Sequence, residues 1–194
     1  MADLVIKPSS GNLVLKDDQN VARLTLATSS GNTTFTGATT LANATITAGG
    51  FPAGHILQVV SATTDGVGDN NNVNSTTFVE VGLDATITPR ATSSKIFIMV
   101  NCSVNLDDAA SIGQAGFTGV SRGGTVLTGS IVGHDDHSTH NPSTCAFNYL
   151  DSPNTTSAIV YEVVAKSNHA DLDWRMNAVD DAEKSTITLM EIAG

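Results

Sequence analysis

The sequence is poor in charged and aromatic residues, and poorest in basic ones. Of its 194 residues only 14% are charged and 5% are aromatic, and nine lysines and arginines stand against nineteen aspartates and glutamates. A formal net charge of −10 without any basic patch has the wrong sign for binding phosphate backbones or anionic lipid headgroups. We therefore expect neither nucleic acid nor a membrane as a partner.

Long apolar runs and cysteines are also scarce. No stretch approaches the run of about 18 apolar residues that a membrane span requires. Residues 1–7 include an aspartate and lack the apolar stretch of a signal peptide, so we expect the chain to fold in a cytoplasm. Two cysteines, Cys102 and Cys145, are too few for a disulfide framework.

Neutral polar residues and regularly spaced apolar ones make up the rest. With 40% apolar residues the chain does not have the low hydrophobicity and high charge of a disordered protein. In residues 1–50 apolar anchors alternate with turn segments at 8–12, 17–20 and 29–32. The anchors are Leu4, Ile6, Leu13, Leu15, Leu24, Leu26, Phe35, Leu41 and Ile46. This pattern, in which Ser-Ser-Gly-Asn occurs twice, predicts very short strands joined by turns.

Residues 1–50 have too few apolar side chains to form a core of their own. About one apolar anchor in five residues does not offset an ordering cost of roughly 1–2 kcal/mol per residue. Identical chains around a symmetry axis would supply the missing cover. A disordered linker is the alternative, and the regular spacing of the leucines disfavours it.

The glycine-rich segment 49–54 predicts a boundary, and the strands beyond it are longer. Residues 96–106 alternate strictly between apolar and mostly polar positions, which indicates a strand with one buried face. Further strands are predicted at 55–62, 76–81, 84–88, 115–121, 124–132, 144–150, 157–165, 171–177 and 185–192, with turns at 121–124 and 151–154. Only 179–184 could form a helical turn. We predict an all-β chain: an N-terminal arm or intertwined shaft over 1–50, then an antiparallel β-sandwich of jelly-roll type over 54–194.

Several segments resemble the C-terminal domains of bacteriophage tail-fibre-like proteins. They are 54–63, 87–96, 120–125, 150–157 and 185–192, and segment 4–13 is similar to the strand-and-turn shafts of such proteins. The resemblance implies a homotrimeric, non-enzymatic virion component with an N-terminal attachment segment and a distal β-sandwich knob. It transfers no functional residue, and the histidine-rich segment 134–140 departs from the pattern.

That segment is the sharpest candidate for a site. His134, His137 and His140, with Asp135 and Asp136 between them, are residues that ligate transition metals. Histidines three apart on an extended strand point to opposite faces, so convergence would need a loop or several chains. A solvated loop tip is the alternative, and we predict no metal or cofactor.

Other candidates are interpreted structurally. Trp174 could stack on a sugar, but it shares a strand face with Leu172 and Met176 and is expected in the core or at a subunit interface. Cys102 and Cys145 are expected to be buried. The segment 65–72 has the composition of a calcium loop without its terminal glutamate and is interpreted as a hairpin.

Acidic doublets at 17–18, 107–108, 135–136 and 180–181 are expected at turns rather than across a catalytic cleft. No nucleophile with its base can be assembled, so we expect no catalytic residue and no enzyme activity. The leading hypothesis is a short trimeric spike on the virion surface, either a short tail fibre or a capsid decoration protein. It would be assembled in the host cytoplasm and bound through its N-terminus to another virion protein. The alternative is a receptor-binding adhesin that recognises host glycan through loops 65–75, 107–114 and 133–143.

Overall fold

The chain forms two compact units, Met1–Thr45 and Ile46–Gly194, and each is described here by itself. The computed structural model describes residues 13–16, 18–20, 22–26, 33–35, 51–65, 72–108, 114–135, 141–170, 172–177 and 184–194. Strands and turns account for all the regular structure in these residues, as the sequence predicted. No helix able to cross a membrane occurs in this part of the chain.

The first unit contains a three-stranded antiparallel sheet in the order β1-β2-β3. Its strands are β1 (Leu13–Lys16), β2 (Ala22–Leu26) and β3 (Thr33–Phe35). The expected turn after β1 is present, with Asn20 at a positive φ of 63° and its side chain accepting a hydrogen bond from Lys16 Nζ at 2.9 Å. Asparagine tolerates this left-handed conformation better than most residues. The strands predicted around Leu4, Ile6, Leu41 and Ile46 lie outside the described residues.

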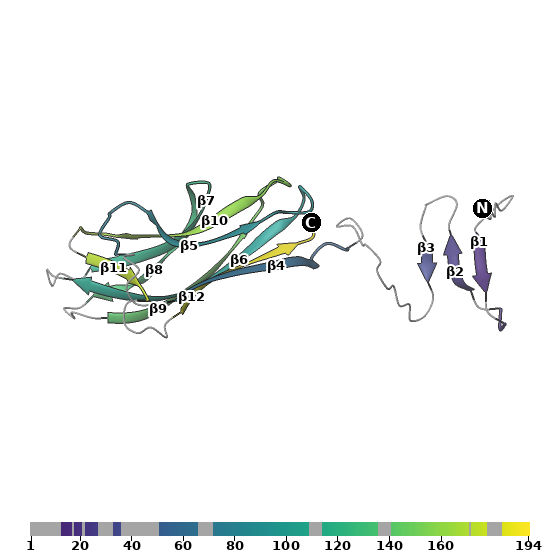
Figure 1. Cartoon of the computed structure of the whole chain (residues 1–194), viewed down its shortest axis with the longest axis horizontal. Helices are drawn as coiled ribbons and strands as arrows, with labels where there is room; N and C mark the ends of the chain where they lie inside the picture. The colour runs from purple at the N-terminus through teal and green to yellow at the C-terminus, as the bar shows by residue number, and fades with distance from the viewer. Residues whose placement is uncertain are drawn as a thin grey trace. The chain divides into compact units, whose positions relative to one another are not determined.

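Nine strands form the second unit, and Figure 1 shows them as two layers. They are β4 (Ile56–Asp65), β5 (Val79–Ile87), β6 (Lys95–Asp108), β7 (Gln114–Arg122), β8 (Thr125–Asp135), β9 (Asn141–Asp151), β10 (Ile159–Ser167), β11 (Leu172–Met176) and β12 (Lys184–Ile192). One sheet has the order β5-β10-β7-β8. In the other, β9 pairs with one edge of β6, while β12 and then β11 pair with its other edge, and β4 pairs with β12.

This connectivity is that of a jelly roll. Without β11 the strands give two four-stranded antiparallel sheets, β4-β12-β6-β9 and β5-β10-β7-β8. Apart from the β7-β8 hairpin, strands neighbouring in sequence are therefore divided between the two four-stranded sheets in the way two Greek keys require. The predicted β-sandwich of jelly-roll type is confirmed, and β11 is a short addition at the end of β6.

The core lies between the two sheets and follows the alternation in the sequence. Along β6 the even-numbered apolar residues from Ile96 to Leu106 are all buried. They meet Tyr161 and Val163 of β10, which are fully buried on the facing sheet. Each such side chain stabilises the fold by roughly 1.5–3 kcal/mol through removal of apolar area from water.

One boundary predicted from the sequence is wrong. The separate strands expected at 76–81 and 84–88 are the single strand β5. Gly82 has a φ of +73° inside the strand, and the pairing with β10 shifts register between Glu162 and Val164. Glycine accommodates such an irregularity without steric cost, so the strand continues through a bulge.

The hairpin between β7 and β8 confirms the turn predicted at 121–124. Gly123 and Gly124 form its two-residue connection with φ values of 54° and 77°. Two consecutive positive φ angles match the twist of the flanking strands and favour glycine at both positions. This hairpin lies at the end of the sandwich opposite the loops considered next.

Candidate functional site

Strands β4, β6, β8 and β10 all end at one end of the sandwich, which we call the loop end (Figure 1). Residues at this end are paired across neighbouring strands: Asp65 lies opposite Lys184, Leu106 opposite Asn141, and Gln114 opposite Asp135. The jelly roll therefore brings together the strand ends of all three loops that the sequence singled out for recognition. Residues 66–71, 109–113 and 136–140 of those loops lie outside the described residues.

The described part of the loop end is tied to the core by backbone hydrogen bonds. Val73 and Trp174 exchange two, with N···O distances of 2.7 and 2.9 Å. Ser167 N donates to the carbonyl of Ser75 at 2.8 Å, and Asn168 exchanges two bonds of 2.9 Å with Ala115, one of them through its side chain. Loops mounted on such a base have the usual placement of a recognition surface.

Trp174 lies beneath this end and is fully buried. Its indole Nε1 donates a hydrogen bond to Thr118 Oγ1 at 3.1 Å, so the polar atom is satisfied inside the core. Leu172 and Met176 are buried on the same strand face. The prediction of a core residue is confirmed, and Trp174 is not a sugar-stacking platform on the surface of this unit.

Most of the histidine cluster lies outside the described residues. The backbones of His134 and Asp135 end strand β8, opposite Ala115 and Gln114. Their side chains, and residues 136–140 with His137 and His140, lie outside the described part. Among the described side chains, no group of three His, Cys, Asp or Glu residues is placed to hold a metal ion. A metal site at 134–140 stays a hypothesis.

The acidic doublets are not all at turns. Asp18 is exposed in the turn between β1 and β2, as expected. Asp107 and Asp108, however, are the last residues of β6, because β11 extends the pairing and places them opposite Asp173 and Leu172. The turn predicted at 107–108 is therefore wrong. Residues 17, 136, 180 and 181 lie outside the described part of the chain.

A buried carboxylate joins the two sheets. Asp151 of β9 accepts hydrogen bonds from Tyr161 Oη of β10 and from Arg122 Nη1 of β7, both at 2.6 Å. Burial, and next the hydrogen bond to Asp151, raise the pKa of the Tyr161 phenol well above its usual range. The phenol is therefore held as a hydrogen-bond donor. The arrangement is a clamp between strands and contains no nucleophile.

A second buried carboxylate lies at the same end of the sandwich, because Asp151 and Glu191 are both direct partners of Ile96. Glu191 of β12 is fully buried and accepts three hydrogen bonds of 2.6 Å, from Gln58 Nε2, Ser94 Oγ and the backbone N–H of Arg90. It thereby ties the connection between β5 and β6 to the C-terminal strand. A carboxylate with this many donors is satisfied, and the site is structural.

The two cysteines face each other inside the sandwich. Cys102 and Cys145 are direct partners in the pairing of β6 with β9, and both are buried with free thiols. Burial raises the pKa of the Cys102 thiol to about 12, and the nearby Cys145 adds to the effect. Low exposure and a scarce thiolate make a poor nucleophile. The prediction that both cysteines are buried is confirmed.

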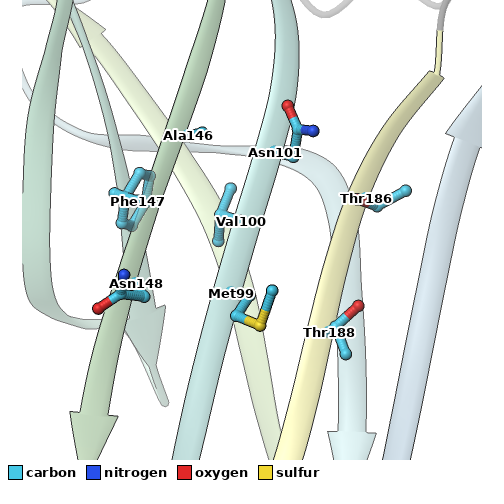
Figure 2. Close-up of a pocket in the computed structure, with 8 residues that line it drawn as sticks. All are labelled: Met99, Val100, Asn101, Ala146, Phe147, Asn148, Thr186 and Thr188. Carbon is cyan, nitrogen blue, oxygen red and sulfur yellow. The ribbon is translucent and has the colours of Figure 1, made fainter.

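A shallow hollow of about 340 Å³ lies on the outer surface of the sheet that contains β6 (Figure 2). Figure 2 shows its side chains coming from β9, β6 and β12. The lining residues are Met99, Val100, Asn101, Ala146, Phe147, Asn148, Thr186 and Thr188. Its polar groups are amides and hydroxyls, which bind by hydrogen bonds and supply no general acid or base at neutral pH.

Sequence reasoning did not find this hollow or either buried carboxylate. The signal for the hollow was present, since Phe97 and Met99 occupy the otherwise polar face of the alternating segment 96–106. The partners of Asp151 and Glu191 come from strands distant in sequence, so no local pattern reveals them.

Comparison with known proteins adds little. No protein-family model matches the sequence, and no curated protein matches it. The chain is similar to the crystal structure of the infectious bursal disease virus VP2 subviral particle, at 15% identity over 71% of this chain and 33% of that one, with a TM-score of 0.40. A structure of the same virus, Gx strain, matches at 14% identity over 71% of this chain and 34% of that one, with a TM-score of 0.36. The chain thus spans about a third of these proteins, and at this similarity neither assigns it a function.

Proposed function

We propose that the chain is a non-enzymatic structural protein of a bacteriophage virion, a short homotrimeric fibre or spike. Its N-terminal arm mounts it on a capsid or tail protein, and the jelly roll projects from the particle surface as a knob. The observation that carries the proposal is the contrast between a self-contained β-sandwich and a small three-stranded sheet in which Leu15 is exposed. The resemblance of both regions to bacteriophage fibre proteins supports the same function.

The arm needs a partner to bury its leucines. In the described register Leu13 lies opposite Leu26 and Leu15 opposite Leu24, and Leu24 in turn lies opposite Phe35. Directly opposed positions belong to one face of an antiparallel sheet. Leu15 is 51% exposed in the single chain. Three copies that pack these faces around an axis would remove the leucines from water.

The buried ionisable groups of the knob support a structural role. Both buried carboxylates are used to hold strands together, and both thiols lie in the core. The arm restricts the kind of fibre, because fifty extended residues reach at most about 165 Å and folded strands reach far less. A short tail fibre or a capsid decoration protein therefore fits better than a long adsorption fibre. Its arm would attach by pairing with an exposed sheet edge.

The test combines the mass of the full chain in solution with its position on the particle. Light scattering is expected to give three times the chain mass at micromolar concentration, and deletion of residues 1–50 is expected to abolish incorporation into particles. Antibody labelling of particles in electron micrographs then separates head from tail. A monomeric full chain, or a deletion variant that still joins the particle, would contradict the proposal.

A glycan-binding adhesin is the second candidate, and the loop end favours it. Three connections of suitable composition share that end, on a base fixed by the Val73–Trp174 hydrogen bonds. A glycan array probed with the full chain tests it, with a chain carrying substitutions in loop 133–143 as the control. Particles that lack the protein and adsorb to cells normally would overturn this candidate and leave the structural role intact.

A further inference from the structure

An apolar row crosses the outer face of the β9-β6-β12-β4 sheet. Leu150 of β9 lies opposite Phe97 of β6, Phe97 lies opposite Met190 of β12, and Met190 lies opposite Val59 of β4. We call these four residues the apolar row. Because direct partners in an antiparallel sheet share a face, the row spans the full width of the sheet on its solvent side.

The ends and flanks of the row are well exposed. Leu150 is 46% and Val59 55% exposed, and Met99, one pair further along β6, is 43% exposed at the rim of the hollow in Figure 2. On the other side of the row Ile56 is 57% exposed beside its partner Ile192. Single exposed apolar residues need no explanation, but a contiguous group of this kind marks an interaction surface.

In the described strands, the part of this face around the apolar row carries no acidic position, and the acidic positions Asp65 and Asp107 come only toward the loop end. Around the apolar row its outward positions are Met99, Asn101, Ser103, Thr144, Ala146, Asn148, Thr186, Thr188, Ser61 and Thr63. These are neutral, although the whole chain has a net charge of −10. Two copies of an acidic chain repel each other wherever their carboxylates meet, so this uncharged patch is better suited to a second copy than the acidic positions at its edge.

The size of the face fits one contact of a larger assembly. Four strands about 4.8 Å apart and seven residues at about 3.4 Å each cover roughly 450 Å² in projection. Each partner in a stable interface buries about 800 Å². The face is therefore too small to hold two copies together alone, and suits a contact that a second element, such as the arm, completes.

We infer that the apolar row and its neutral flanks are the surface through which the sandwich of one copy packs against a neighbouring copy. The inference rests on the proposed homotrimer and adds which surface of the knob takes part. In the assembled protein Met99 and the apolar row are shielded from water, while the loop end stays accessible.

The test uses the full chain and matched variants on the two outer faces. Val59→Lys with Leu150→Lys places two charges on the row, and Val160→Lys is the control at a 39% exposed position on the other sheet. Sedimentation at graded concentrations is expected to show at least a tenfold weaker assembly for the double variant and no change for Val160→Lys. Circular dichroism checks that both variants remain folded. Equal behaviour of the two would overturn the inference.

Methionine oxidation supplies a readout that does not depend on the arm. In dilute hydrogen peroxide, Met99 of the assembled wild-type chain is expected to oxidise about tenfold more slowly than Met99 of the double variant, while the buried Met176 is slow in both. If the chain is trimeric but Met99 reacts equally fast in both, the inference is wrong and the proposed function stands. If light scattering finds a monomer, the proposed homotrimer fails first.

Discussion

The two outer faces of the sandwich differ although both sheets contribute alike to the core. The β9-β6-β12-β4 sheet turns the apolar row and neutral amides and hydroxyls outward. The β5-β10-β7-β8 sheet turns Asp84, Glu162 and Lys166 outward, and Phe78 lies against Gly119 and Gly129 there. The charged face is thus covered in part by the chain's own side chains, whereas Leu150 and Val59 at the two ends of the apolar row are exposed.

This difference teaches that alternation fixes which residues are inside but leaves the role of the outward residues open. An outward position with a charge is adapted to water, and an outward position with an exposed apolar side chain beside other such positions is adapted to a partner. The two-residue alternation in the sequence does not distinguish these two kinds of outward position. They are told apart only when the register aligns neighbouring strands.

Truncating a side chain in the core that both sheets share is expected to have the largest effect on the free energy of unfolding. It should affect both outer faces alike. Trp174→Ala leaves a large cavity beside Thr118 and should lower the free energy of unfolding by about 3–5 kcal/mol. Urea titration followed by circular dichroism measures the loss. Trp174→Phe, which keeps most of the apolar area and loses only the indole N–H, is the control with a smaller loss.

Hydrogen exchange on the same variant tests whether the two faces depend on one core. Amides of β6 and of β10 are expected to lose protection together, because both strands pack on the same cluster. If the β5-β10-β7-β8 sheet keeps its protection while β6 exchanges freely, the sheets are separate cooperative units and the comparison is between two domains.

The next largest effect is expected at Glu191, which ties the sheet with the apolar row to the connection between β5 and β6. Glu191→Ala removes the acceptor of Gln58, Ser94 and the Arg90 amide and leaves the buried Ser94 hydroxyl without it, at a cost of about 2–4 kcal/mol in total. Glu191→Gln keeps one acceptor oxygen and should lose less. Thermal unfolding of both variants measures the difference. A change below 0.5 kcal/mol for the alanine variant, judged against the usual spread at surface positions, would contradict the structural assignment.

Much of the fold could be predicted from the sequence because it depends on local patterns. The strand at 96–106 and the Gly123–Gly124 turn follow from side-chain alternation and from the conformational preference of glycine. The division of β5 into two predicted strands was wrong, because the strand continues through a bulge at Gly82 that depends on its pairing with β10. The extension of β6 to Asp108 was missed because it depends on pairing with β11.

The candidate sites were predictable only in part. The burial of Trp174 and the two cysteines follows from alternation, and so does the shared location of the loops once a jelly roll is assumed. The clamp at Asp151 and the apolar row do not, because each is assembled from strands that are 10 to 131 residues apart and meet through the sheet register alone. Metal binding by the histidine segment 134–140 stays a hypothesis.

Alkaline pH is expected to lower the free energy of unfolding of the sandwich, whose core both faces share. The folded pKa of Cys102 is raised from 9.0 to about 12, and that of Tyr161 is raised above 10.0, chiefly by burial. Groups that bind protons more tightly when folded stabilise the protein fully below their unfolded pKa and lose this as pH rises. Stability should therefore fall from about pH 9 upward. Urea midpoints between pH 7 and 11 measure the slope.

Two variants separate the contributions to that slope. Cys102→Ala should flatten the part that begins near pH 9, and Tyr161→Phe the part above pH 10, although each variant is less stable at neutral pH. A wild-type midpoint that stays constant up to pH 11 would show that neither group changes its pKa on folding.

The smallest effect is expected on the charged face, at Lys166. Its ammonium lies 5.0 Å from the ring centres of both Phe78 and Phe117, so the cation packs over two aromatic faces. Lys166→Met keeps the stem and removes the charge, and should cost about 0.5–1 kcal/mol in urea unfolding, whereas Lys166→Arg should cost less. Neither change should alter the assembly measured by sedimentation. If Lys166→Met weakened assembly as strongly as Val59→Lys with Leu150→Lys, the charged face would be the contact surface, because a covered and charged face should otherwise be indifferent to a neighbouring copy.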